Sequence, residues 1–199
     1  MGTRLSALVL LLPLFASCAP ISSAPTTGQV ESRLKTDPLS PEVTAKLKHL
    51  DGMTEDQLIA TYRNKTRIGY EPSHGTQIEY TSANGQAWLW YPGNTVIIPG
   101  EWKRKDSAEN YEFPANEGEG KTYTVPKTEI CFRYGKNTHN PVTGHRGGGF
   151  ECNPIALMKL LSDETIVSGD IFGLAGRKAV PFVLPKRKQL SINDVNKRL

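Results

Sequence analysis

The residues best suited to chemistry lie in the polar loop 135–149, which contains two histidines, an arginine and three consecutive glycines. His139 and His145 are six residues apart, and Arg146 follows directly. A histidine there could act as a general base while the arginine orients an anion, and bare glycine backbone lets a ligand approach closely. The simpler interpretation is a solvated loop. Two histidines could also bind a metal, but no carboxylate lies near them in the sequence. We therefore predict a candidate binding loop, with no metal and no cofactor.

Trp88 and Trp90 are a second candidate binding feature, because side chains two residues apart on a strand point to the same face. If that face is exposed, the two indoles could stack on sugar rings. If it is buried, they belong to the hydrophobic core, where aromatic side chains contribute most of the packing area. We favour the core interpretation.

No catalytic residue can be predicted from motifs. The chain has neither a Gly-x-Ser-x-Gly elbow nor a His-Glu-x-x-His pair. Asp163, Glu164 and the acidic residues of 109–119 fall in predicted loops. Paired carboxylates can hydrolyse glycans when they are about 5–10 Å apart, a separation that the sequence does not give. A non-enzymatic role is therefore favoured over an enzyme.

The first twenty residues predict export. Arg4 precedes an apolar run over 5–15, and small residues lead directly into Cys18. This run is shorter than the roughly 20 apolar residues of a membrane-spanning helix, so residues 1–17 are predicted to be a signal peptide. Phe15-Ala16-Ser17-Cys18 resembles a bacterial lipobox.

The lipobox resemblance implies that Cys18 is acylated and becomes the first residue of a membrane-anchored protein. Each buried methylene of an acyl chain contributes about 0.8 kcal/mol to attachment. Ala19, which is not an acidic residue, points to the outer membrane, with the protein facing the periplasm. The alternative is ordinary cleavage after Ala19 or Ala24, which would release a soluble periplasmic or secreted protein.

The other two cysteines, Cys131 and Cys152, are 21 positions apart and form a predicted disulfide. A loop of that length gives about 3 kcal/mol of stability in the chain-entropy model. The two thiols lack CxxC spacing, which argues against zinc, while a catalytic thiol remains an alternative.

Charge is concentrated at the C-terminus. Residues 177–199 contain seven basic residues and one acid, Asp194. We predict a basic tail over 186–199 that could contact anionic lipid or polysaccharide, with a solvated terminus as the simpler interpretation. Nucleic acid is not an expected partner, because the chain is predicted to be exported and carries no nucleic-acid motif.

The elements that must position these residues are mainly strands. Residues 18–40, rich in Pro, Ser, Thr and Gly, are a predicted flexible tether. Helices are expected after Ser40 and after the capping box Thr54-x-x-Gln57. Runs of alternating residues separated by turn residues then predict an antiparallel meander, and a closed or half-open barrel, within a single domain over 41–185. The expected strands are 76–81, 86–91, 95–98, 101–104, 121–125, 128–134, 165–168 and 179–184. Residues 105–120 are expected to be a loop or a long hairpin tip, and a short helix is expected from Asn153-Pro154 through Leu161, with a strand as the alternative there.

The segment from Leu58 to Cys152 resembles a family of short exported proteins, mostly from alphaproteobacteria, whose function is unknown. The resemblance lies in Tyr62-Arg-Asn-Lys-Thr66, in Tyr80 with Asn84-Gly85, in Gly100-Glu101-Trp102, and in Ile130-Cys-Phe-Arg-Tyr134 with Cys152. It implies a small antiparallel sheet in which the Gly-x-Trp strand lies beside the Cys-Phe-x-Tyr strand. It implies no catalytic residues.

The expected function is that of a lipid-anchored binding module of the bacterial envelope. Its partner would be another envelope protein, or a polymer such as peptidoglycan or polysaccharide. One alternative is a small periplasmic hydrolase that uses His139 or His145 with Arg146. Another is a secreted effector.

Overall fold

The computed structural model describes residues 27–115, 120–141, 144 and 146–199. The predictions for the signal peptide, for Cys18 and for His145 concern residues outside these ranges. Within the described part, no helix has the length and apolar character needed to cross a bilayer.

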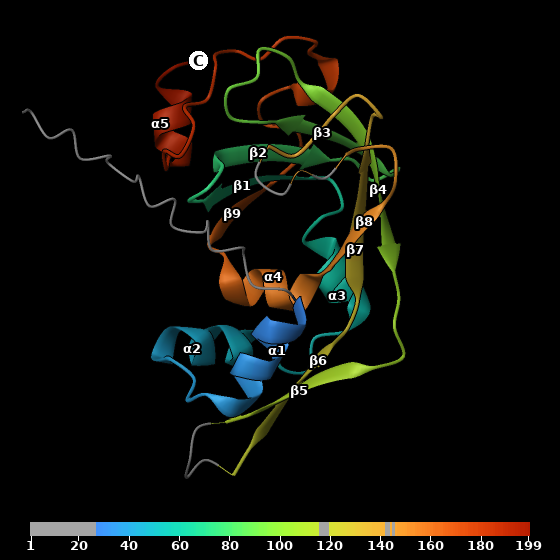
Figure 1. Ribbon diagram of the computed structural model, residues 1–199, viewed down its shortest axis with the longest axis vertical. Helices are drawn as coiled ribbons and strands as arrows, with labels where there is room; N and C mark the ends of the chain where they lie inside the picture. Colours follow the sequence, from blue (N-terminus) through green and yellow to red (C-terminus); the bar gives the residue numbers. More distant parts are fainter. Residues whose placement is uncertain (1–26, 116–119, 142–143, 145) are drawn as a thin grey trace, which may run out of the picture.

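The described residues form a mainly antiparallel β structure built on one curved sheet of seven strands (Figure 1). The two edge strands do not pair with each other, so the barrel is half open, and the predicted fold class is confirmed. The strands, in the order in which they pair, are β8 (Glu151–Pro154), β7 (Glu129–Tyr134), β4 (Ile98–Lys105), β3 (Gln86–Trp90), β2 (Gly75–Thr81), β1 (Lys65–Glu71) and β9 (Glu164–Ser168).

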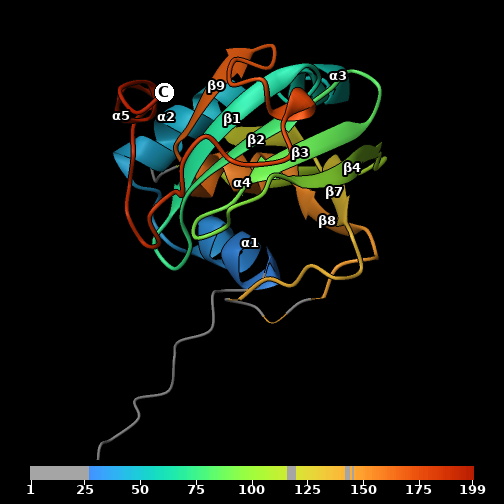
Figure 2. The ribbon, with the colours of Figure 1, turned by 90° about the horizontal axis from the view of Figure 1, so that it is seen from above.

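Short helices pack around this sheet. Helix α4 lies inside the bend of the sheet, with α1, α2 and α3 beside it, while the chain around α5 lies at the opposite end of the molecule (Figures 1 and 2). The face turned toward α4 is called the inner face below. The helices are α1 (Thr27–Thr36), α2 (Pro41–Leu50), α3 (Glu55–Ala60), α4 (Ile155–Leu161), α5 (Ile192–Asn196) and the 3-10 turn η1 (Leu174–Gly176).

The predicted helix starts are confirmed by their caps. The Ser40 hydroxyl accepts a hydrogen bond from the backbone N–H of Val43 at 3.2 Å. Thr54 and Gln57 form the reciprocal capping box, with Thr54 N–H donating to the Gln57 side chain at 2.7 Å. These bonds satisfy donors that have no partner within the first helical turn.

The predicted tether contains a helix and is wrong for that part. Within 18–40, the residues of α1 are helical, and Val30 is buried. Leu39, farther along the same segment, also packs into the core. The composition of the segment is polar on average, but these few apolar side chains are enough to hold it against the domain.

The meander exists, but its strands are placed differently from the prediction. Strand β1 was not predicted, and 95–98 and 101–104 are not separate strands: β4 runs from Ile98 through Pro99-Gly100 without turning. Gly100 serves close packing here, because a Cβ on it would lie 2.6 Å from the ring of Tyr134. The Asn84-Gly85 turn between β2 and β3 is confirmed, with Gly85 at a φ of +87°.

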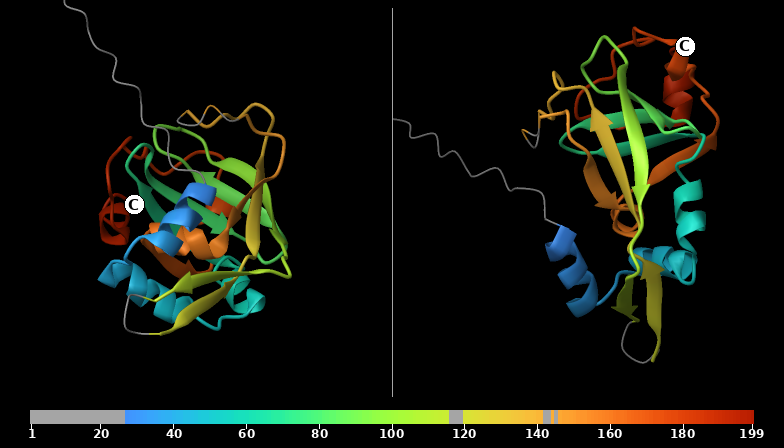
Figure 3. Two further views of the ribbon diagram at one scale, coloured as in Figure 1. Left: turned by 60° about the horizontal axis from the view of Figure 1, so that its bottom comes forward. Right: turned by 90° about the vertical axis from the view of Figure 1, so that its right-hand side faces the viewer.

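Of the two expectations for 105–120, a loop or a long hairpin tip, the structure shows a hairpin. Strands β5 (Asn110–Pro114) and β6 (Thr122–Pro126) pair with each other and extend the β4–β7 ribbon beyond the large sheet (Figure 3). Tyr111, Phe113 and Tyr123 alternate with polar residues and are buried. The acidic residues face solvent. The segment therefore has the composition of a loop although it forms two amphipathic strands.

The C-terminal segment also differs from the prediction. Residues 179–184 form no strand, and their ladder pairing is limited to an isolated bridge from Ala179 to Val96. The segment is not simply solvated, because Leu184, Leu190 and Val195 are buried against the outer face of the sheet. Folded structure therefore extends past the predicted domain boundary at 185.

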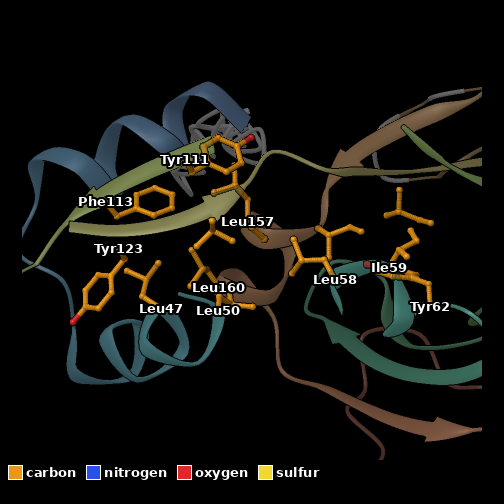
Figure 4. Close-up of a cluster of buried hydrophobic side chains, with 14 of the residues drawn as sticks. Leu47, Leu50, Leu58, Ile59, Tyr62, Tyr111, Phe113, Tyr123, Leu157 and Leu160 are labelled. Atoms are coloured by element: carbon orange, nitrogen blue, oxygen red, sulfur yellow. The ribbon is translucent and has the colours of Figure 1, made fainter. Parts of the chain in front are cut away.

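Two hydrophobic clusters hold these parts together. The lower cluster joins α2, α3 and α4 to the β5–β6 hairpin and to the inner face of the sheet (Figure 4). The upper cluster joins the outer face, through Ile68, Ile78 and Trp90, to Phe172, Leu184 and the rest of the C-terminal segment. The two clusters lie on opposite faces of the sheet. Packed side chains therefore support its curved shape on the inner and on the outer face.

The disulfide and the predicted strand neighbours are confirmed. Cys131 and Cys152 are directly opposite each other on β7 and β8 and are bonded. Trp102 on β4 pairs with Phe132 on β7, so the Gly-x-Trp strand does lie beside the Cys-Phe-x-Tyr strand.

We predict that Trp90→Ala lowers the free energy of unfolding by about 3–5 kcal/mol, because it empties a fully buried indole site. It also removes the donor to the backbone carbonyl of Phe182, at 3.1 Å. Urea unfolding of the two variants tests this, with Trp88→Ala as the matched control because Trp88 is only half-buried. Equal losses in the two variants would contradict the assignment of Trp90 to the core.

Candidate functional site

The structure brings only part of the predicted histidine loop together. His139 and Arg146 pair across the loop as an isolated antiparallel bridge, and both are exposed. The glycines close the loop on itself: Gly147 N–H donates to the Thr138 carbonyl at 2.9 Å, and a Cβ on Gly147 would lie 2.2 Å from the Thr138 hydroxyl. At Gly147, bare backbone is therefore needed for loop packing.

The two tryptophans do not join this loop in a site. Trp90 is fully buried in the upper cluster, as the core interpretation predicts, and Trp88 stacks on Tyr80 with ring centroids 5.6 Å apart. Both alternate along β3 with Leu89, which faces the inner side of the sheet. The tryptophans therefore lie on the outer face.

Two adjoining cavities lie on the inner face of the sheet. The large cavity has a volume of about 600 Å³ and opens between the turn after β3 and the loop after β7. The small cavity, of about 290 Å³, lies beside it, toward β1 and the end of α4. We call them together the sheet cavities. They share four lining residues: Gln77, Leu89, Phe132 and Tyr134.

Regular strands position these shared residues. Gln77 lies on β2, Leu89 on β3, and Phe132 and Tyr134 on β7, each two residues from another inward-facing position. Their backbones are held by the hydrogen bonds of the sheet. Among the sequence-predicted candidates, His139 lines the rim of the large cavity. The sequence therefore located one rim residue and missed the cavity walls.

A buried charged network forms the floor of the small cavity. The Arg67 guanidinium on β1 donates to one carboxylate oxygen of Glu79 on β2, directly opposite it in the sheet. The Tyr134 hydroxyl on β7 donates to the other oxygen of the same carboxylate. Glu164 on β9 lies 3.9 Å from Nη1 of Arg67. The network therefore ties four strands together.

Aromatic rings enclose the guanidinium. Arg67 lies 3.9 Å from the ring centroid of Tyr62 and 5.5 Å from that of Phe132. Only 6% of its surface is exposed, and its Nε and Nη1 atoms are buried without a hydrogen-bond acceptor in the described part of the chain. Burial also raises the pKa of Tyr62 to about 12, so its hydroxyl remains neutral beside the cation.

The protonation behaviour of the network follows from its burial. Burial raises the pKa of the Glu79 carboxyl above its ordinary value, although the charge of Arg67 and the hydrogen bond from Tyr134 oppose the rise. Burial and the neighbouring Glu79 together raise the pKa of Tyr134, which stays a neutral donor. Both oxygens of Glu79 are already occupied, so the carboxyl is held in a structural role. This arrangement supports binding in the cavity above it and not proton transfer.

Arg67, Glu79 and Tyr134 were not among the site residues predicted from the sequence. Arg67 lies in a strand that was not predicted, and Tyr134 stood out only as part of a motif. Opposite charges at facing, inward positions of neighbouring strands stabilise each other. Arg67 and Glu79 are such a pair and could have indicated the site. That signal requires the register of β1 against β2, which the sequence alone did not supply.

Comparison with known proteins adds no assignment. No family model matches the chain, and no curated protein and no solved structure matches it either. The resemblance to short exported alphaproteobacterial proteins therefore stays a prediction, and the candidate site rests on its geometry.

We predict that Arg67→Met lowers the free energy of unfolding by about 3–5 kcal/mol, because it leaves the buried Glu79 carboxylate without its cation. The double variant Arg67→Met/Glu79→Gln should recover part of this loss, since no uncompensated charge remains. Urea unfolding of the single and double variants measures the coupling. Strictly additive losses would show that the two side chains do not interact in the folded protein.

Proposed function

We propose that this protein is a bacterial cell-envelope lipoprotein that acts as a binding module and holds its ligand in the sheet cavities. The observation that carries the proposal is the large cavity itself. Its volume of about 600 Å³ lies within the range of roughly 300–1,000 Å³ that is usual for ligand pockets. Its inner wall comes from strands and needs little ordering when a ligand binds, which reduces the entropic cost of binding.

The lining supports binding over catalysis. Apolar and aromatic walls from Leu89, Ile98 and Phe132 surround a small number of amide and hydroxyl groups, as in pockets that orient a ligand. Within the described residues, the charged groups of the floor are paired with one another. His139, one of the residues of the hydrolase alternative, lies exposed at the rim.

The proposed anchor places the domain close to the membrane. If Cys18 carries the lipid, eight residues (19–26) separate it from the first residue of α1. A fully extended chain of that length spans at most about 28 Å. The cavities would then work near the lipid surface.

The anchor is tested with Cys18→Ser. In cells that express the full chain, we expect the wild-type protein to partition with membranes into detergent. The variant should appear in the soluble periplasmic fraction, because it lacks the acylated thiol. A variant that stays with membranes would contradict anchoring through Cys18, and so would a soluble wild-type protein.

The cavity is tested with Leu89→Trp, which fills the wall shared by the sheet cavities. Leu161→Trp, on an exposed position of α4, is the matched control. Each protein is incubated with a muramidase digest of peptidoglycan and with an envelope polysaccharide extract, then analysed by native mass spectrometry. We expect the wild type and the control to retain a bound species that Leu89→Trp loses.

Three outcomes would count against this proposal. No retained species, or equal retention by Leu89→Trp, would overturn binding in the sheet cavities. Shortened products in the incubation mixture that disappear with His139→Ala would favour the hydrolase instead.

A further inference from the structure

The charges that line the sheet cavities decide which ligands can enter. Among the described lining residues, the carboxylates are Glu71, Glu79, Glu151 and Glu164, and the permanent cations are Arg67 and Lys186. Lys159 on α4 adds a third cation close to the floor, because its charge interacts with Glu164 and Arg67. The acidic groups then exceed the basic ones by one, so the lining offers an acidic ligand no net attraction in a partly desolvated space.

The arginine at the floor does not reverse this balance. Arg67 already contacts Glu79, and Glu164 lies 3.9 Å from it. Its guanidinium is also shielded by the ring of Tyr62. The two donors of this guanidinium that lack an acceptor among the described residues, Nε and Nη1, are themselves buried. With two carboxylates beside it and an aromatic ring over it, the guanidinium therefore offers little attraction to a phosphate or carboxylate ligand.

The neutral polar groups of the lining are suited to hydroxyl groups. Gln77 lines both cavities, and its side chain makes no hydrogen bond with any described residue. Asn94 and Asn137 place two further amides, and Thr138 a hydroxyl, around the large cavity. Amides and hydroxyls both donate and accept hydrogen bonds, as sugar hydroxyls do.

The apolar groups of the lining complete this pattern. The rings of Phe132 and Tyr134 are nearly parallel, at 3°, with centroids 6.3 Å apart, and Leu89 and Ile98 lie on the neighbouring strands. Together they give the cavity an apolar wall beside the polar groups. A saccharide ring has matching surfaces, with a C–H face and a rim of hydroxyls.

From these observations we propose that the ligand of the sheet cavities is a saccharide without acidic groups. The inference rests on the proposed binding function and specifies its ligand class. It also moves the sugar-binding surface from Trp88 and Trp90, on the outer face, to the inner wall formed by Phe132, Tyr134 and Gln77.

The test compares two trisaccharides of similar size by isothermal titration calorimetry on the folded chain. The neutral probe is the trimer of N-acetylglucosamine, and the acidic probe is the trimer of galacturonic acid. We expect the neutral trimer to bind at least tenfold more tightly. Equal or tighter binding of the acidic trimer would overturn the proposal, as would the absence of binding by both at millimolar concentration.

A matched pair of variants locates the binding. Gln77→Ala should weaken binding of the neutral trimer at least fivefold, because it removes an unpartnered amide from both cavities. Gln86→Ala, on the exposed side of β3, should leave it unchanged. Thermal unfolding of both variants checks that they fold. Equal effects of the two substitutions would place the sugar elsewhere and overturn the proposal.

The two proposals can fail separately. If native mass spectrometry shows a retained species that Leu89→Trp loses, but neither trisaccharide binds, the cavity binds a ligand of another class and only the saccharide inference fails. If no species is retained and neither trisaccharide binds, both proposals fail.

Discussion

The ion pair between Arg67 and Glu79 is the constraint on which the rest of the structure depends. A charge removed from water is costly unless it is paired and hydrogen-bonded. The surrounding elements therefore have to supply what this pair needs: Glu79 from β2, the hydroxyl of Tyr134 from β7, and the carboxylate of Glu164 from β9. Each partner comes from a different strand, so the network is complete only when the sheet has its native register and curvature.

The inner face of the sheet is filled with side chains at one end and open at the other. At one end, α4 and the β5–β6 hairpin fill the bend with apolar side chains such as Leu157 and Phe113, which join Trp102 and Ile130 of the sheet in one cluster. At the other end, no element of the described part of the chain fills the space above the charged floor, and the cavities remain. The outer face is covered by the C-terminal segment through Leu184 and Val195. Both faces of the sheet are thus supported, while one end of the inner face is left open.

The features predicted correctly from the sequence are those set by neighbouring residues. The Ser40 cap, the Thr54 capping box, the Asn84-Gly85 turn and the helix before Ser162 depend on a few adjacent side chains. The errors arose where distant contacts decide. Pro99-Gly100 has the composition of a turn but lies within β4, because the Tyr134 ring on β7 needs bare backbone beside it. The candidate site was missed for the same reason, since Arg67 and Glu79 meet only through strand register.

The central claim is that the Arg67 guanidinium is sealed beneath the cavities and paired there. Hydrogen exchange of arginine Nε–H groups, followed by NMR, tests this most directly, with the Arg67 signal assigned by its loss in Arg67→Met. Arg133, whose side chain is 41% exposed, is the reference within the same chain. The Arg67 Nε–H should exchange at least about 100-fold more slowly than that of Arg133, because solvent reaches it only when the sheet opens. Exchange at equal rates would show that the Arg67 guanidinium is open to solvent in the folded protein.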